Sequence, residues 1–262
     1  DVYKRQPLVR LLANDDLDDL GEHVVYGGMY GQWIQWASSY SAYLIIACAL
    51  LFLIALFRVK PPTKQLLIGI PTSIGILIGT IAVGVAAFQL INLMLGTTVN
   101  WPADDRPYRA TLIFSTAAGG LTMTTLAHRF SSQIAMMFAG WLVWLGICTL
   151  VVIYLPDAAN TFLIPTPFAC LLLFVISFLP IIWRPWVFCL VLVGAIPTTL
   201  GTVYALEQTQ GYTLIAATMP SIGLFMLAFA PFVSGINLRH GLLLTYLATS
   251  LSIAACTLTP LY

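Results

Sequence analysis

Long apolar stretches without a single charged residue restrict the folds open to this chain. Ser41 to Phe57 is unbroken apolar sequence, and the stretch from Gln65 to Leu95 also lacks any charge, although about 20 residues suffice for a helix to cross a bilayer. A soluble domain of 262 residues must cover itself with polar side chains, but this chain is 60% hydrophobic and only 8% charged. Average soluble domains carry about 25% charged residues. We therefore expect the chain to fold in lipid as a bundle of transmembrane helices.

The apolar segments predict an all-α, polytopic membrane bundle of about eight spans. Their expected bounds are Ser41–Phe57, Gln65–Leu95, Tyr108–Ala127, Gln133–Leu155, Thr161–Ile181, Pro185–Leu206, Tyr212–Gly235 and Gly241–Leu258. Polar turns separate them, such as the cationic and proline-rich turn from Arg58 to Lys64. The second segment is longer than a bilayer requires, so we expect its helix to be tilted, kinked at Pro71 or prolonged beyond the interface.

Charge is distributed unevenly between the loops, and the asymmetry predicts an orientation. The loops after the first, third, fifth and seventh spans hold cations and no carboxylate, namely Arg58, Lys60, Lys64, Arg129, Arg184 and Arg239. The opposite side holds the acids, including Asp104, Asp105, Asp157 and Glu207, with Arg106 and Arg109 as the cations of its loops. Because cytoplasmic loops carry an excess of Lys and Arg, we expect the amino terminus to face outward. Eight spans would then place Tyr262 outside as well.

The middle of every expected span lacks Asp, Glu, Lys and Arg. Ion-coupled carriers and proton pumps usually need such residues within the membrane, so their absence argues against that class. A net charge of +1 and the lack of a basic run argue against a nucleic-acid partner. The polar residues within the spans are mild, chiefly Gln89, Asn92 and many Ser and Thr. We interpret them as contacts between helices or as hydroxyls bonded back to their own helix.

Small residues and prolines within the spans have a structural interpretation. Gly75 and Gly79 form a GxxxG motif, and Gly119 with Gly120 makes a second notch, both typical of closely packed helices. Prolines recur in or near the spans at positions 71, 165, 167, 180, 197, 220 and 231. Broken helices can line a transport site. Without a charged partner nearby, we interpret these prolines as tolerated helix features.

Residue types that often bind metals are present but do not form a metal-binding pattern. Five cysteines fall inside apolar segments without CxxC spacing, and we interpret Cys48, Cys148, Cys170, Cys189 and Cys256 as small core residues. The three histidines, His23, His128 and His240, are too scattered for a metal site. We expect the pairs His128–Arg129 and Arg239–His240 to lie near helix C-termini, where a cation meets the negative end of the dipole.

Two polar segments outside the spans could bind a ligand, but simpler interpretations account for them. The segment from Asn14 to His23 contains Asp15, Asp16, Asp18, Asp19 and Glu22. It lacks the glycine and the closing glutamate of an EF-hand, so a solvated connector or helix cap is favoured. The loop from Trp101 to Arg109 combines carboxylates, arginines and aromatics, which favours anchoring at the membrane surface. Trp33, Trp36, Trp101 and Trp183 lie near expected span ends, as interfacial tryptophans do.

The first six residues, Asp1 to Gln6, read as translated sequencing-adapter sequence, so we exclude them from the fold. We expect the natural protein to extend further upstream. The remaining chain divides into residues 7–40, a connector, and residues 41–262, the transmembrane helical domain.

The order of features around the connector resembles a known family. The run VRLLANDDLDDLGEHVVYGGMYGQWIQWASSYSAYLI combines a short helix from Val9 to Leu20, an acidic connector, a strand-like piece from Val24 to Gly31 and the start of a membrane span. This resembles the junction in membrane-bound zinc aminopeptidases of metallopeptidase family twenty-eight, such as the endoplasmic-reticulum metallopeptidase and the vacuolar membrane protease. A second stretch, Tyr154 to Phe174, is similar to the family's Leu-Pro turn followed by a Leu-x-Pro helix start, although Asp157 to Asn160 departs from that pattern.

The resemblance implies that a soluble peptidase domain with two zinc ions precedes this membrane region. Residues 7–40 would then be its tail and connector, and the zinc ligands and catalytic glutamate would all lie upstream. We accordingly expect this chain to contain no catalytic, cofactor-binding or metal-binding residue. Its partners would be membrane lipid and the covalently linked peptidase domain, with the oligomeric state left open. A bacterial inner membrane with a periplasmic amino terminus fits these expectations.

Two other interpretations stay open at this stage. The first is a multi-span permease or lipid-handling protein with a site between its helices, which a midplane charged pair or an inverted repeat would favour. The sequence shows neither feature. The second is a non-enzymatic assembly scaffold. Whether a soluble domain is encoded upstream distinguishes it from the membrane anchor of a peptidase.

Overall fold

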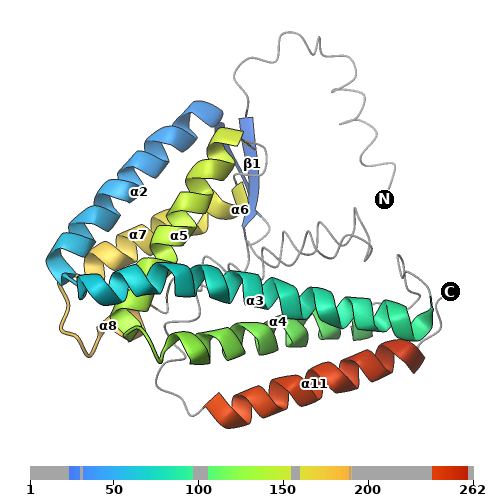
Figure 1. Cartoon of the computed structure of the whole chain (residues 1–262). Helices are drawn as coiled ribbons and strands as arrows, with labels where there is room; N and C mark the ends of the chain where they lie inside the picture. Colours follow the sequence, from blue (N-terminus) through green and yellow to red (C-terminus); the bar gives the residue numbers. More distant parts are fainter. Residues whose placement is uncertain are drawn as a thin grey trace, which may run out of the picture.

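A computed structural model describes residues 24–29, 32–96, 106–154, 160–188, 190 and 238–258. Helices make up this part of the chain apart from one two-stranded hairpin at its beginning (Figure 1). The long helices are α2 (Ser38–Val59), α3 (Thr63–Leu95), α4 (Arg106–Ala127), α5 (Gln133–Tyr154) and α11 (Leu238–Leu258). Each lies within three residues of a span expected from hydropathy.

Four of these helices, α2 to α5, are long and apolar enough to cross a membrane. The apolar part of α11, Leu242–Leu258, is shorter. The described helices are therefore consistent with an integral membrane protein. The expected span Tyr212–Gly235 lies outside the described residues.

Two helix ends are set by residues in the left-handed conformation. Gly96 has φ 66° and ends α3, its N–H donating to the carbonyl of Leu93 at 3.4 Å. Lys60 has φ 48° and ends α2, its N–H donating to the carbonyl of Leu56 at 2.9 Å. Pro61 and Pro62 follow Lys60 and cannot donate further helical hydrogen bonds. Pro71, by contrast, lies inside α3 without ending it.

The expected span Thr161–Ile181 is not one helix. It consists of α6 (Asn160–Leu163) and α7 (Pro165–Ile176), separated at Ile164. Proline is well suited to the first position of a helix because its missing N–H has no helical partner there, and Pro165 begins α7. A short helix, α8 (Arg184–Phe188), follows. The rest of the expected span Pro185–Leu206 lies, apart from Leu190, outside the described residues.

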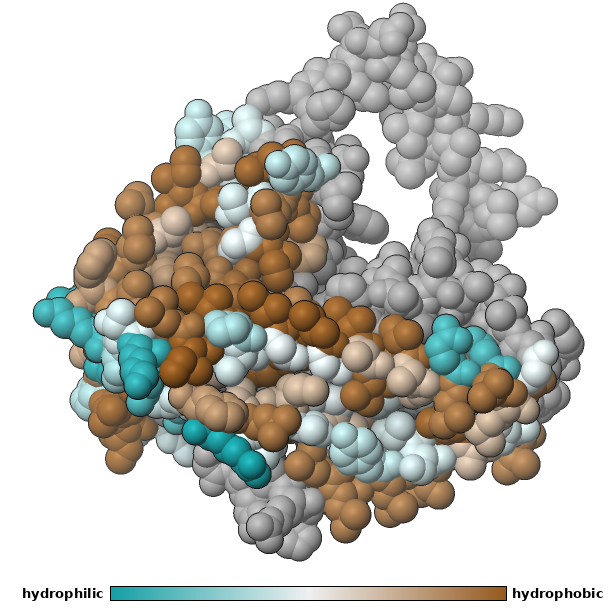
Figure 2. Space-filling model, viewed as in Figure 1, coloured by the Kyte–Doolittle hydropathy of each residue, from teal (hydrophilic) through white to brown (hydrophobic). Residues whose placement is uncertain are grey.

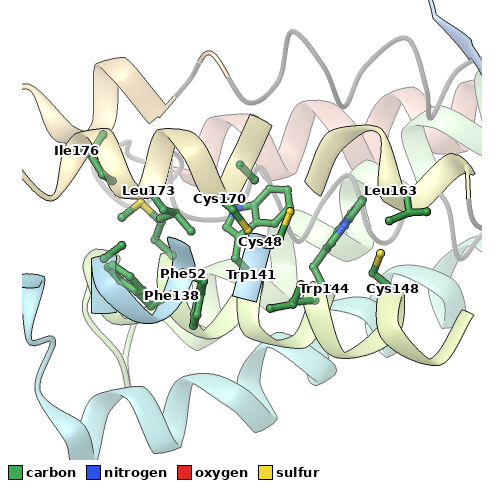
Figure 3. Packing of buried hydrophobic residues seen from close by; sticks show 14 residues of the cluster. Cys48, Phe52, Phe138, Trp141, Trp144, Cys148, Leu163, Cys170, Leu173 and Ile176 are labelled. Carbon is green, nitrogen blue, oxygen red and sulfur yellow. The ribbon is translucent and has the colours of Figure 1, made fainter. Parts of the chain in front are cut away.

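The helices form two groups, and the contact of α3 with α5 joins one group to the other. In the first group α7 packs along α2 and contacts α5, around a core that holds Phe52, Phe138, Trp141 and Leu173 (Figure 3). Phe52 and Phe138 meet edge to face with their ring centroids 5.7 Å apart. In the second group α4 lies between α3 and α11. In Figure 1 the two groups meet where α2 ends and α3 begins, and they diverge from there.

A β-hairpin precedes the first membrane helix. Strands β1 (Val24–Met29) and β2 (Gln32–Ala37) pair antiparallel, with Val24 opposite Ala37 and Met29 opposite Gln32. Strand β1 coincides with the strand-like piece expected from Val24 to Gly31. The chain passes from β2 directly into α2, and the indole Nε1 of Trp36 donates to the hydroxyl of Ser41 at 2.9 Å. The hairpin is thus fastened to the start of α2.

Candidate functional site

Buried hydroxyl groups line the contacts of α3, α4 and α11. Most of them donate to the carbonyl three or four residues earlier in their own helix, as in Thr80 (2.7 Å), Thr111 (2.9 Å), Thr116 (2.6 Å), Thr124 (2.7 Å), Thr249 (2.7 Å) and Ser252 (2.7 Å). This confirms the interpretation of the mild polar residues as self-bonded hydroxyls. Gln89 is exposed on α3, and its interpretation as a contact between helices stays a prediction, because two of the expected spans lie largely outside the described residues.

Two of the glycines singled out by sequence lie at close approaches between helices. A Cβ added to Gly119 of α4 would lie 2.9 Å from the carbonyl oxygen of Gly79 and 2.9 Å from the Cβ of Val83, both on α3. A Cβ at Gly79 would meet the side chain of Met123 at 2.3 Å. Gly75, by contrast, has nothing within 4 Å of an added Cβ. The packing interpretation therefore holds for Gly79 and Gly119, but not for Gly75.

A polar and thiol cluster lies in the core of the first helix group. The indole Nε1 of Trp144 in α5 donates to the hydroxyl of Thr166 in α7 at 3.0 Å, and that hydroxyl also bonds the carbonyl of Phe162. The hydroxyl of Thr166 lies 3.8 Å from the sulfur of Cys148. Cys48 of α2 and Cys170 of α7 belong to the same core, and Figure 3 shows the two side chains side by side.

The cysteines in the described chain behave as core residues. Cys48, Cys148, Cys170 and Cys256 are free and buried, as the sequence predicted. The fifth, Cys189, lies outside the described residues. Within the described ranges, no group of three or more His, Cys, Asp or Glu side chains could hold a metal ion.

One histidine pair lies after the end of a helix, and the other lies at the start of a different helix. His128 and Arg129 follow α4, as expected, and the backbone N–H of His128 donates to the carbonyl of Thr124 at 3.0 Å. Arg239 and His240 lie in the first turn of α11, because that helix begins at Leu238. The expected C-terminus near this second pair is that of the span Tyr212–Gly235, which lies outside the described residues, so that expectation stays a prediction.

Loops that lie far apart in the sequence meet at one end of the molecule. Arg58 in the last turn of α2 lies over the ring of Phe178, which follows α7, with its guanidinium carbon 3.9 Å from the ring centroid. The hydroxyl of Ser131, between α4 and α5, donates to the carbonyl of Gln65 in the first turn of α3 at 3.1 Å. The α2–α3 turn is thus joined to the end of α7 and to the α4–α5 turn.

Helix α11 begins at the same end, because it runs antiparallel to α4. Thr111 of α4 contacts the sulfur of Cys256 at 3.6 Å, and Thr122 contacts the hydroxyl of Tyr246 at 2.9 Å. The pairing places the start of α11 near the end of α4. All four loops expected to share one side of the membrane therefore have described residues at this end.

We call this end the cationic face and define it by Arg58, Lys60, Lys64, Arg129 and Arg184. Hydrophilic side chains gather at the left end of the view in Figure 2, where α2 meets α3, and brown apolar side chains cover much of the length of the helices. The described residues contain no carboxylate at all, since each of the ten Asp and Glu of the sequence lies outside them. The described cations of this face therefore meet no described counter-charge.

Several segments considered from sequence lie outside the described residues. They are the acidic segment from Asn14 to His23, the part of the outer loop from Trp101 to Asp105, and Asp157 with its neighbours. Trp183 and Trp36 are described. Trp183 is exposed between α7 and α8, whereas Trp36 is partly buried in β2.

Comparisons with models of known protein families, with curated proteins and with solved structures gave no match to this chain.

Sequence reasoning identified the cationic loops but not the contacts that join them. Neither the stacking of Arg58 on Phe178 nor the bond from Trp144 to Thr166 follows from hydropathy, because a hydropathy pattern does not specify which helices are neighbours. The Cys48–Cys170 pair was missed for the same reason, since each thiol alone is typical of a small core residue. For the contact of Arg58 with Phe178, the sequence offered two signals: a cation at the end of one helix and an aromatic residue just after a later one.

Proposed function

We propose that this chain is the membrane domain of a zinc-dependent aminopeptidase and holds the peptidase domain at the outer face of the membrane. The observation that carries the proposal is the cationic face at one end of the helices, with the β-hairpin at the other end of α2. Because cations favour the cytoplasmic side, the hairpin and the chain before it face outward. An external peptidase domain requires that orientation.

The peptidase assignment rests on the resemblance of residues 7–40 and 154–174 to the junction and membrane region of metallopeptidase family twenty-eight. The strand pairing of Val24–Met29 with Gln32–Ala37 supports it, because it gives the connector a defined structure directly before the first span. The chemistry would belong to the upstream domain, whose His, Asp and Glu residues would hold zinc, and the metal would there supply Lewis-acid activation for peptide hydrolysis.

Anchoring contributes to the activity by holding the peptidase domain near its substrates. A peptidase held at the membrane surface meets membrane-associated peptides at a raised local concentration, as any tethered pair does. The helical domain itself then needs no catalytic group. Its mild, self-bonded hydroxyls suit an anchor better than a carrier, whose pathway generally needs midplane charges. We assign the protein to the inner membrane of a bacterium, with a periplasmic amino terminus.

The upstream reading frame tests the peptidase assignment. Extending it in the source DNA should reveal a domain containing His, Asp and Glu residues arranged as ligands for two zinc ions. Purified full-length protein should then contain zinc by elemental analysis and release amino-terminal residues from peptides, and chelation should abolish that release. A start codon close to residue 7, or an unrelated upstream domain, would contradict the proposal.

Cysteine labelling tests the orientation separately. In a variant whose five native cysteines are replaced by serine, Lys60→Cys would place a thiol on the cationic face and Tyr40→Cys one at the start of α2, where Tyr40 is 64% exposed. A membrane-impermeant maleimide added to intact cells or spheroplasts should label Tyr40→Cys and not Lys60→Cys. Lysis should make both reactive. Labelling of Lys60→Cys in intact cells would reverse the assigned sidedness.

A further inference from the structure

The cationic face contains two arginines whose side chains are held in place. The guanidinium of Arg58 lies 3.9 Å over the ring centroid of Phe178, and the Nε of Arg184 donates to the carbonyl of Leu179 at 3.1 Å. A guanidinium carries five N–H donors, so the bond from Nε leaves the terminal amino groups of Arg184 available to a further acceptor. Planar donors fixed in this way match the oxygens of a phosphate.

Lys60 adds a charge at a strained backbone position. It is the one residue other than glycine with positive φ in the described chain, at 48°. A residue with a Cβ is strained in the left-handed region, where glycine is not. The turn therefore holds a lysine where glycine would be the less strained residue. A role for the charge itself explains that choice.

Large apolar side chains are exposed in the same segments as these cations. Phe57, Phe178, Trp183 and Trp186 are between 56% and 72% exposed and lie in the last turn of α2, after α7 and in α8. The two tryptophans are of the kind that favours the level of the lipid headgroups. A ligand with both a phosphate and an apolar chain would contact the arginines and the rings together, whereas a free phosphate would leave the rings unused.

We propose that the cationic face binds an anionic phospholipid, with Arg58, Lys60 and Arg184 around its phosphate and Phe178 and Trp183 against the first part of an acyl chain. Basic sites between transmembrane helices recognise anionic headgroups by the same chemistry. The proposal needs only the membrane setting of the helices and does not depend on the peptidase assignment. It makes this end of the bundle a lipid-recognition site as well as a topology signal.

Native mass spectrometry of the full chain in detergent tests the proposal. Phosphatidylglycerol and phosphatidylcholine with identical acyl chains are the two probes. The protein should bind phosphatidylglycerol at least about fivefold more tightly, and Arg58→Gln and Arg184→Gln should each reduce its affinity about fivefold. Arg106→Gln removes the same charge from α4 at the other end of the bundle and should leave the affinity unchanged. Equal binding of the two lipids, or an equal loss in Arg106→Gln, would overturn the proposal.

Lys60→Gly separates binding from folding. Glycine relieves the left-handed backbone, so the melting temperature should stay the same or rise, while the affinity for phosphatidylglycerol should fall about fivefold. Unchanged affinity in this variant would remove Lys60 from the site and contradict the proposed role of its charge.

Inorganic phosphate serves as the competitor that lacks an acyl chain. If millimolar phosphate displaced phosphatidylglycerol completely, the site would be one for free anions and the lipid proposal would fail.

Discussion

At the scale of single residues, the absence of one Cβ sets the distance between α3 and α4. An alanine at position 119 would place its Cβ 2.9 Å from the carbonyl oxygen of Gly79, and a backbone oxygen cannot move aside as a flexible side chain can. We expect Gly119→Ala to reduce the free energy of unfolding by about 1–3 kcal/mol, as overpacking usually does. Chemical unfolding in detergent, followed by circular dichroism, measures the change.

Gly75→Ala is the matched control on the neighbouring helix. An added Cβ at Gly75 meets nothing within 4 Å, and alanine is the better helix former by about 1 kcal/mol. This variant should be as stable as the parent or more stable. A loss of stability equal to that of Gly119→Ala would mean that the close approach of α3 and α4 is not what these glycines provide.

The hydroxyl of Thr166 is a second residue-scale feature, because it joins two helices rather than bonding only within one. It accepts the indole N–H of Trp144 at 3.0 Å in a fully buried setting. Thr166→Val keeps the shape but leaves Trp144 with only the longer bond to the carbonyl of Phe162 at 3.4 Å. A loss of about 1–2 kcal/mol in unfolding free energy follows from burying a poorly satisfied donor.

The comparison variant for Thr166→Val is Thr149→Val. The hydroxyl of Thr149 donates within α5, to the carbonyl of Leu145 at 2.8 Å. Its removal leaves no buried donor in need of a partner, so the same denaturation measurement should change by less than about 0.5 kcal/mol. Equal losses in the two variants would show that the bond between α5 and α7 contributes nothing of its own.

At the scale of elements, the contact of α2 with α7 can be tested through two thiols. Cys48 and Cys170 lie side by side across this contact, whereas Cys148 lies against Thr166 of α7. Copper phenanthroline should join Cys48 to Cys170, so the denatured protein should show two fewer free thiols by maleimide titration. Cys170→Ser should abolish the loss, and Cys148→Ser should leave it intact. Full retention of free thiols in the parent would mean that α2 and α7 are not neighbours.

The bounds of the long helices could be predicted from the sequence because charges and prolines delimit them. Lys60 and the two prolines after it end α2, and Gly96 ends α3, so a hydropathy pattern suffices. The division of the expected span Thr161–Ile181 could not be predicted in that way. Its residues are uncharged throughout, and only Pro165 as the first residue of α7 marks the new helix start.

The packing of the candidate sites could not be predicted from the sequence either, for a physical reason. Hydropathy reports how each segment partitions between water and lipid, but the partners of a helix depend on the shapes that meet. Gly75 and Gly79 look equivalent in a GxxxG motif, yet only Gly79 meets a neighbouring helix. The cationic loops were predictable because charge is visible residue by residue, while the stacking of Arg58 on Phe178 depends on the fold.

At the scale of the whole molecule, the cationic face should determine how the bundle inserts. Three of its cations, Arg58, Lys60 and Lys64, lie in or directly beside the short turn between the first two long helices, and positive charges near the first spans usually dominate orientation. Replacing all three by glutamine should yield a mixed population. In the cysteine-free background with Tyr40→Cys, labelling of intact cells should fall from nearly complete to partial.

A variant with Arg106 and Arg109 replaced by glutamine is the control, since it removes cations from the opposite end. Its labelling at Tyr40→Cys should stay complete, because it leaves the bias toward the cationic face in place. If the triple replacement left labelling unchanged, the remaining cations Arg129 and Arg184, or other parts of the chain, would be enough to orient the bundle. The α2–α3 turn would then act in lipid binding alone, which the phosphatidylglycerol measurement on Lys60→Gly detects independently of orientation.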